Sequence, residues 1–259
     1  MRSIFAEFRR ISILLVAVFC TCVFALDTRA VVDIATGVNF RGSTSGVNIF
    51  ATPADANGCV GPAHFVEFIN GRFAVYLKST GTKVLDQTDS AFWSNMGINV
   101  PSGFDTTDPR LIYDRTVGRW FALQIDYSTT GTDQANRFML AISVTSDPTG
   151  AWKGVTIPGD PTALNFADFP TLGLNAEAVF ISGEFFALAG GGPNGSILIS
   201  IPKADLLLAT PSVARRTVFS PLPEGSNGVI LQPVVNLNVG STNAWVFSTP
   251  HDEIGRAHV

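Results

Sequence analysis

Four aspartates stand ahead of the proline-led apolar segments of this chain, and their side chains could do chemistry if the fold collected them: Asp55, Asp105, Asp108 and Asp168. Carboxylates that converge repel one another unless a cation or an arginine offsets their charge. Such a group could bind a cation or take part in acid–base chemistry. An aspartate before a proline also commonly caps a turn by accepting backbone N–H bonds, so a structural role stays open for Asp108 and Asp168.

Calcium is one ligand that this set could bind. Oxygen donors from Asp55, Asn57, Asp108 and Asp168 would suit Ca²⁺, which takes about six to eight oxygens, and the metal itself would lie between the three aspartates. An EF-hand is excluded, because the twelfth position counted from Asp55 is Val66, where that loop needs a bidentate glutamate.

The elements that must position these residues are short strands separated by turns. A proline followed by an apolar segment recurs at Pro62, Pro109, Pro170 and Pro233, and each time a polar turn and a second apolar segment follow. The low content of charged residues and the frequent turn residues are typical of an all-β protein. The only mature helix expected is a turn or two around residues 204–208.

A four-stranded unit that repeats along the chain is the pattern of a β-propeller, in which the first strand of each blade lines the central channel. We therefore predict a partial β-propeller of about four antiparallel, four-stranded blades, each opening on a proline-led strand. A β-sandwich is the alternative, since it also shows short strands with turns between them.

The hairpin Ser146–Trp152 resembles the Asp-box hairpin of sialidase-type propellers, with one register change. The resemblance implies that Asp147 caps the turn, that Gly150 has a positive φ and that Trp152 packs between blades, on the face away from the ligand. Stacking of a sugar on Trp152 is the functional alternative.

Residues 53–210 as a whole resemble a group of secreted bacterial proteins of propeller type, of largely uncharacterised function. The motifs that carry the resemblance include Asp55-Ala56-Asn57-Gly58, Asn70-Gly71-Arg72-Phe73, Asp108-Pro109-Arg110 and Asp168-Phe169-Pro170-Thr171. The resemblance implies the fold and secretion but no reaction.

Glycoside hydrolysis is a second chemistry open to the carboxylates. Five-bladed glycosidases place one carboxylate per early blade at the channel mouth, and Asp55, Asp108 and Glu184 are the possible counterparts. Inverting hydrolysis needs two carboxyl groups about 6.5–9.5 Å apart, one of them with a raised pKa. The apolar neighbours of Glu184 could raise its pKa, although a glutamate at a loop end facing water is the simpler interpretation.

The ends of the chain predict four segments. Arg2, Arg9 and Arg10 precede an apolar run, which predicts a secretory signal peptide over 1–30 with cleavage after Ala25 or Ala30. We expect an N-terminal strand or linker over 31–52 and an incomplete propeller over 53–252. The tail from Ile254 resembles a translated sequencing adapter, so we expect residues 253–259 to be an artefact.

Charge and the apolar pattern narrow the classes of partner. The net charge is −4, and no basic block or stripe occurs outside the signal segment, which disfavours nucleic acid. We expect no stable membrane span in the mature chain and a secreted or surface location.

The leading hypothesis is a non-catalytic propeller that binds a glycan or an extracellular protein at its channel face, with calcium as a structural ion. A propeller glycoside hydrolase and a purely architectural domain of a larger secreted protein are the alternatives. A hydrolase should show two spaced carboxylates in an open pocket, a binding domain an aromatic-rimmed pocket, and an architectural domain a plugged channel.

Overall fold

The computed structural model describes residues 35–130, 134–188, 190–249 and 256–258. The chain divides into two compact units, Met1–Gly37 and Val38–Val259, and the second contains every strand described below. The predicted signal peptide, residues 1–30, lies outside the described residues.

The second unit is built almost wholly of strands. Their bounds are β1 Asn57–Val60, β2 His64–Ile69, β3 Arg72–Leu77, β4 Lys83–Gln87, β5 Phe104–Asp114, β6 Arg119–Ser128, β7 Arg137–Ser143, β8 Trp152–Pro158, β9 Asn165–Leu174, β10 Ala178–Ala187, β11 Pro193–Pro202, β12 Thr217–Leu222, β13 Val229–Pro233, β14 Val246–Thr249 and β15 Arg256–His258.

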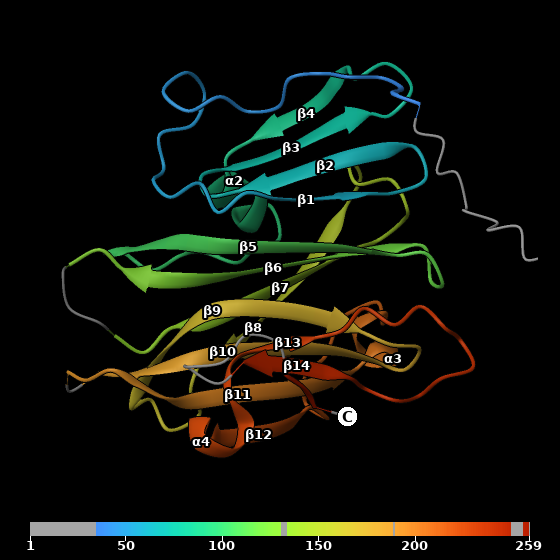
Figure 1. Cartoon of the computed structure of the whole chain (residues 1–259). Coiled ribbons are helices and arrows are strands. Elements are labelled where there is room, and N and C mark those ends of the chain that lie inside the picture. The colour runs from blue at the N-terminus through green and yellow to red at the C-terminus, as the bar shows by residue number, and fades with distance from the viewer. Residues whose placement is uncertain (1–34, 131–133, 189, 250–255, 259) are drawn as a thin grey trace, which may run out of the picture. The chain divides into compact units, whose positions relative to one another are not determined.

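These strands form four antiparallel sheets in which neighbours in sequence are neighbours in space (Figure 1). We call them blade 1 (β1–β4), blade 2 (β5–β8), blade 3 (β9–β12) and blade 4 (β13–β15). Blades 1 to 3 have four strands each, and blade 4 has three among the described residues. The predicted all-β fold, a partial propeller of antiparallel blades, is confirmed.

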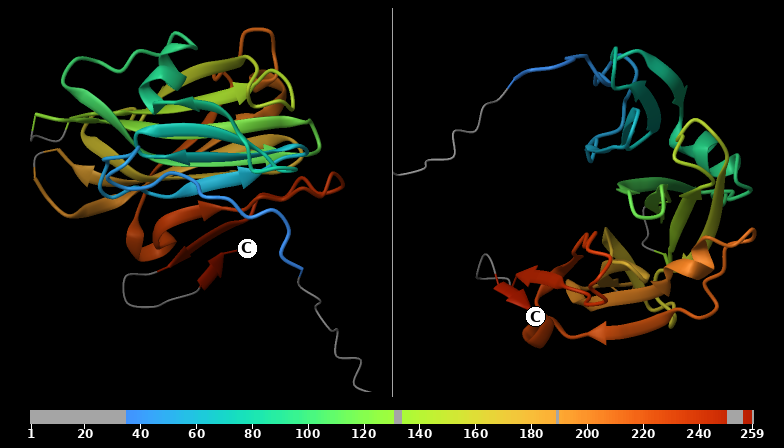
Figure 2. Two further views of the ribbon diagram at one scale, coloured as in Figure 1. Left: turned by 90° about the horizontal axis from the view of Figure 1, so that it is seen from above. Right: turned by 90° about the vertical axis from the view of Figure 1, so that its right-hand side faces the viewer.

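Successive blades face one another and share two apolar cores. One core lies between blades 1 and 2 and contains Phe73, Trp93 and Trp120. The other lies between blades 2 and 3 and contains Phe121, Phe138 and Ile199. The first strands of successive blades, β1, β5, β9 and β13, lie beside one another, and the sheets follow one another along an arc (Figure 2, right).

Period-two alternation explains how one strand serves both cores. In β6, Trp120 and Ala122 point to the core shared with blade 1, while Phe121 and Leu123 point to the core shared with blade 3. Blade 2 is therefore covered on both faces, as its continuous apolar sequence requires.

The expectation that a proline opens each blade is wrong. Pro109 and Pro170 lie in the middle of β5 and β9. Pro62 precedes β2, the second strand of blade 1, and Pro233 ends β13 rather than beginning it. The repeat that relates the blades is a backbone irregularity, described below, to which only two of the four prolines contribute.

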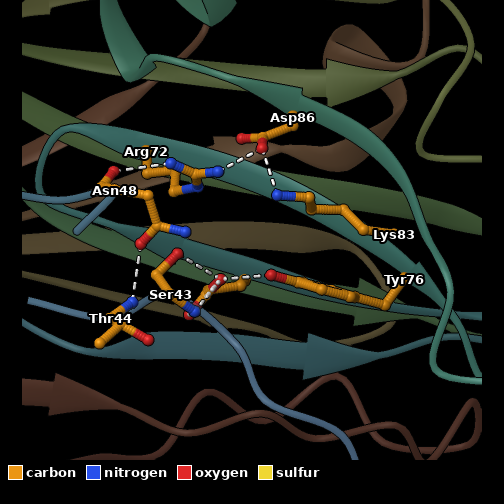
Figure 3. A network of polar contacts seen from close by, with 8 residues as sticks. Ser43, Thr44, Asn48, Arg72, Tyr76, Lys83 and Asp86 are labelled. Carbon is orange, nitrogen blue, oxygen red and sulfur yellow. Dashed lines mark hydrogen bonds and ion pairs between the residues drawn. The ribbon is translucent and has the colours of Figure 1, made fainter.

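Residues 38–50 cover the face of blade 1 that points away from blade 2. Glu67 of β2 accepts hydrogen bonds from the Ser43 backbone N–H at 3.0 Å, the Ser43 hydroxyl at 2.8 Å and the Tyr76 hydroxyl at 3.0 Å (Figure 3). The ring of Phe40 stacks on Tyr76 with the ring centroids 4.9 Å apart. The described part of the predicted 31–52 segment forms no strand, and these contacts fix it on the blade.

Three short helices interrupt the strands: α2 (Asp89–Ser94), α3 (Lys203–Leu206) and α4 (Glu224–Asn227). The helix expected around residues 204–208 is confirmed as α3. Helix α2 was not expected, although Thr88 is a regular N-cap whose hydroxyl accepts the Ala91 N–H at 3.1 Å. None of the helices in the described ranges has the length and apolarity of a membrane span.

Candidate functional site: a carboxylate-lined cavity

The same irregularity occurs in the first strands of blades 2 to 4 and in the segment just before β1 of blade 1. It is a bulge in which two residues face one residue of the next strand. The first residue of each pair is a non-glycine with positive φ: 40° at Asp55, 59° at Asp108, 47° at Phe169 and 48° at Ile230. The pairs are Asp55-Ala56, Asp108-Pro109, Phe169-Pro170 and Ile230-Leu231, and the residues that face them are Ile69, Gln124, Gly183 and Ser248.

This bulge is the true repeat of the chain, and it explains the two internal prolines. The second bulge residue stands outside the regular ladder, so a proline there removes no ladder hydrogen bond. A left-handed backbone is costly for a side chain with a Cβ, and for Phe and Ile it is an outlier. Backbone strain clusters at functional sites, so the same strain at one position of four blades makes these bulge residues candidates for a functional site.

The bulges of blades 1, 2 and 3 turn their first side chains into one cavity of about 640 Å³, which Asp55, Asp108 and Phe169 line. Asp105 and Asp168 line it as well. The four aspartates that the sequence singled out therefore meet at one place, although their proline-led spacing was not the reason. A bulge re-aims a side chain that regular pleating would have sent elsewhere.

Asn70 joins the two acidic bulges. Its Nδ2 donates to Oδ2 of Asp55 at 2.6 Å and to the hydroxyl of Thr107 at 3.1 Å, while its Oδ1 accepts the backbone N–H of Asp108 at 2.9 Å. Asn70 is buried and lies in the turn between β2 and β3, where Gly71 supplies a φ of 82°. The sequence predicted this turn but not its contact with the site.

Asp108 is the carboxyl group of the cavity whose protonation the site alters most clearly. Burial, a hydrogen bond to Asp55 and the negative charge of Asp168 raise the pKa of Asp108 to about 6, against a weaker opposing hydrogen bond from Thr107. Two carboxyl groups in direct contact hold a proton between them, because the fully ionised pair would place like charges side by side. Asp108 can therefore hold or release a proton near pH 6.

A fifth carboxylate, Asp89, lies at the start of α2 and also lines the cavity. It is 3% exposed, and its Oδ2 accepts from the Gly71 N–H, the Thr106 hydroxyl and the Gln124 amide at 2.8–3.1 Å. Sequence reasoning missed it because α2 was not predicted. The signal that could have found it is Thr88, an N-cap residue just before an acidic first turn.

Aromatic and basic side chains complete the lining. Phe166, Phe169 and Tyr127 contribute ring surface, and Arg110 contributes a guanidinium group. Burial and the neighbouring carboxylates Asp105 and Asp89 raise the pKa of the Tyr127 phenol, so it stays a hydrogen-bond donor throughout the ordinary pH range. The cavity thus combines several acceptors with a few donors and an apolar rim.

Two candidates from the sequence lie elsewhere. Asn57 follows the first bulge and is paired with Phe68 in the sheet, and Glu184 lies in the middle of β10 opposite Asp168. The described lining of the cavity includes neither. Glu184 is 3% exposed, so the interpretation as a water-facing residue at a loop end is wrong, and its catalytic role stays a prediction.

Calcium binding by Asp55, Asp108 and Asp168 also stays a prediction. Within the described ranges, no group of three or more Asp, Glu, His or Cys side chains has an arrangement that could hold a metal ion. The hydrogen bond between Asp55 and Asp108 uses a proton where a bound cation would otherwise offset their charge.

The hairpin Ser146–Trp152 joins β7 to β8 and has contacts of a structural kind. Asp147 accepts the N–H and the hydroxyl of Thr149 at 2.9 and 2.7 Å, as a turn-capping aspartate does. Trp152 packs edge-on against Phe73 of blade 1 with the ring centroids 5.7 Å apart, so it lies between blades. The expected positive φ at Gly150 is not found.

No protein-family model matches this chain, and a comparison with curated proteins finds no match. Among solved structures, the chain is similar to an exo-β-1,3-galactanase from Phanerochaete chrysosporium with β-1,3-galactotriose, with a TM-score of 0.39 and 10% identity over 76% of this chain and 44% of that one. The structure of the same enzyme with galactose gives a TM-score of 0.33 and 8% identity, over 57% of this chain and 43% of that one.

An exo-β-1,3-galactanase from Clostridium thermocellum gives a TM-score of 0.30 with 14% identity, over 82% of this chain and 57% of that one. The chain therefore spans about half the length of these enzymes. The blades and the bulged first strands rest on the geometry of this chain alone.

Proposed function

We propose that this protein binds a neutral glycan in the carboxylate-lined cavity. The observation that carries the proposal is the convergence of the bulge residues Asp55 and Asp108 with Asp168 on one cavity of about 640 Å³. Carboxylate oxygens accept hydrogen bonds from hydroxyl groups and are stronger acceptors than neutral oxygens. A sugar offers several hydroxyl donors on one small frame, which matches a cavity with several fixed acceptors.

The charge balance of the lining supports a neutral ligand. Five aspartates line the cavity, and Arg110 is the single Lys or Arg side chain among the described lining residues. A carboxylate or sulfate on the ligand would meet mainly like charge at short range. Uronate and sulfated sugars are therefore disfavoured, while an uncharged oligosaccharide meets no such repulsion.

The test uses the full chain and a panel of neutral trisaccharides of glucose, galactose, mannose and xylose, with oligogalacturonate as the anionic comparison, measured by saturation-transfer NMR and calorimetry. We expect at least one neutral trisaccharide to bind and oligogalacturonate not to bind. Asp168→Asn should weaken that binding about tenfold, the scale of one lost charge-assisted hydrogen bond.

Asp86→Asn is the matched control, because Asp86 lies in an ion pair on the outer part of blade 1. It should leave the affinity unchanged. Binding of the uronate in preference to every neutral trisaccharide, or no binding at all, would refute the proposal.

Glycoside hydrolysis is the second candidate, and the hydrogen-bonded pair of Asp55 and Asp108 favours it. A carboxyl group that keeps its proton to about pH 6 can act as a general acid toward a glycosidic oxygen. On this proposal Asp108 donates the proton and Asp168 is the second carboxylate. Asp55 is in hydrogen-bond contact with Asp108 and is therefore too close to it for the spacing that hydrolysis needs. Release of reducing sugar from the neutral trisaccharides measures it, because their sugar leaving group needs the proton. Activity should fall above about pH 6 and be lost in Asp108→Asn, whereas a binding protein shows no turnover.

A further inference from the structure

The four bulge residues differ in chemical character along the chain. Blades 1 and 2 place Asp55 and Asp108 at this position, and blades 3 and 4 place Phe169 and Ile230 there. The acidic residues and the first apolar one line the same cavity. The bulge positions therefore give the cavity two acidic side chains from blades 1 and 2 and one apolar side chain from blade 3, beside the carboxylate of Asp168.

Phe169 is held in a conformation that burial does not explain. Its φ is 47°, which is strained for an aromatic residue, and 42% of its surface is exposed. Its backbone N–H donates to Oδ1 of Asp168 at 2.8 Å, which fixes the turn of the chain at that point. The fold thus presents an apolar ring to the cavity instead of packing it in a core.

Neighbouring residues support the ring in this place. Phe186 lies beside it with the ring centroids 6.3 Å apart at 52°. Gly183 faces the bulge from β10, and a Cβ there would lie 3.2 Å from the Asp168 carbonyl oxygen and 2.9 Å from the Phe138 ring. A larger residue at position 183 would therefore crowd the Phe138 ring and the backbone beside Phe169, and the glycine avoids this.

We propose that Phe169 is a stacking platform that makes this cavity selective for pyranosides, that is, for sugars in closed ring form with an apolar C–H face. This inference rests on the proposed glycan function. A pyranose ring carries hydroxyls at its edge and C–H groups on its face, so one edge can reach Asp55 and Asp108 while the face lies on the Phe169 ring. An aromatic ring contributes specific contact energy to such a face beyond simple burial. The matching open-chain alditol keeps the hydroxyls of the methyl pyranoside and has two more, but it has no rigid C–H face.

The experiment compares four methyl β-pyranosides, of glucose, galactose, mannose and xylose, with their four matching alditols, by saturation-transfer NMR titration on the full chain. The wild-type protein should bind at least one pyranoside more tightly than its alditol. Phe169→Gly should lower the affinity for that pyranoside about three- to tenfold and leave the affinity for the alditol unchanged. Glycine adopts a positive φ without strain, so this variant should fold at least as well as the wild type.

Ile230→Gly is the matched control. It removes an apolar side chain of similar exposure, 43%, from the equivalent bulge of blade 4, which is outside the described lining of the cavity. It should change neither affinity. Equal binding of pyranoside and alditol, or a preference that survives in Phe169→Gly, overturns the stacking role while the glycan proposal stands. Binding of no pyranoside and no neutral trisaccharide overturns both.

Discussion

Asp108 has a neighbourhood that makes the stability of this protein depend on pH. Around it lie Asp55, Asp105 and Asp168 as acids and Arg110 as a base. Burial is the largest cause of its raised pKa, followed by the hydrogen bond to Asp55. A raised pKa means that the folded state holds a proton that the unfolded chain releases. The contribution of Asp108 to stability is therefore fully present below the ordinary pKa of an aspartate and is lost as pH rises through about 6.

We predict that Asp108→Asn removes this dependence. The amide imitates the protonated acid, so wild type and variant should have similar free energies of unfolding near pH 4. Between pH 4 and pH 7 the wild type should lose roughly 1 kcal/mol relative to the variant, a figure reduced for partial exposure to solvent. Chemical denaturation at both pH values measures it. Asp105→Asn, at an exposed position, is the control, and a constant difference between wild type and Asp108→Asn contradicts the assignment.

At the scale of elements, the bulge in each first strand is a local conformation that the sequence does not favour. Ile230 is the most strained example, since a β-branched residue has φ 48° there. Such strain persists where the surrounding structure determines the backbone, here through the pairing of β13 with β14 on both sides of the bulge.

In a regular strand a glycine variant is usually less stable than an alanine variant, and we predict the reverse at Ile230. Ile230→Gly should be more stable than Ile230→Ala by about 1 kcal/mol, because only alanine keeps the left-handed penalty. At the buried neighbour Leu231 the order should be normal, with Leu231→Gly the less stable of its pair. Urea denaturation of the four variants decides, and the same order at both positions would show that the bulge is not strained.

Lys203 joins two elements of different blades by a buried ion pair. It begins α3, which lies between β11 and β12 of blade 3, and it contacts Asp114 at the end of β5 in blade 2. The two side chains are 3% and 0% exposed. Burial by itself would raise the pKa of Asp114, but hydrogen bonds from Lys203 and Thr116 hold that pKa below its usual range. Arg119 faces Asp114 across the hairpin, but its guanidinium donates to the Gly118 carbonyl.

We predict that Lys203→Met destabilises the protein by about 3–5 kcal/mol, because it leaves the carboxylate of Asp114 buried without its cation. Lys203→Met combined with Asp114→Asn should recover part of this loss. Lys83→Met, which breaks the partly exposed pair with Asp86, should cost about 1 kcal/mol or less. Thermal unfolding measures the stability of the three variants. If Lys203→Met loses no more stability than Lys83→Met, the ion pair of Lys203 with Asp114 is not buried.

Across the whole second unit, blade 2 is the part that both cores share. Its strands β6 and β7 contribute fully buried residues to each core, such as Trp120 and Met139 on one side and Phe121 and Leu140 on the other. The last strands of the blades, β4 and β12, have mostly exposed or half-buried residues. Local opening requires the least free energy where few apolar contacts are lost.

We predict that amide hydrogen exchange is slowest in β6 and β7 and much faster in β4 and β12. Exchange followed by mass spectrometry on the full chain measures this directly. Leu123→Ala, at a fully buried position between blades 2 and 3, should accelerate exchange in both of these blades together. Acceleration confined to β6 would mean that the blades do not form one cooperative unit.

Sequence alone determined the strands, the hairpin turns and the aspartates of the site. Runs such as Phe138–Ser143 alternate or stay apolar over a strand's length, and turns such as Asn70-Gly71 contain the residues that hairpins need, so these features are local. The same pattern placed Asp55, Asp108 and Asp168 near the starts of blades. The prediction that a proline opens each blade was wrong, because a proline is tolerated at the bulge but does not create it.

Tertiary structure alone decided which residues meet. The positive φ at Asp55, Asp108 and Phe169 follows from pairing on both sides of each bulge, and that pairing is a property of two strands and not of one. Asn70 and Asp89 reach the cavity from a turn and a helix whose sequences look purely structural. Contacts between blades join residues far apart in the chain, and the apolar pattern within one strand does not predict them.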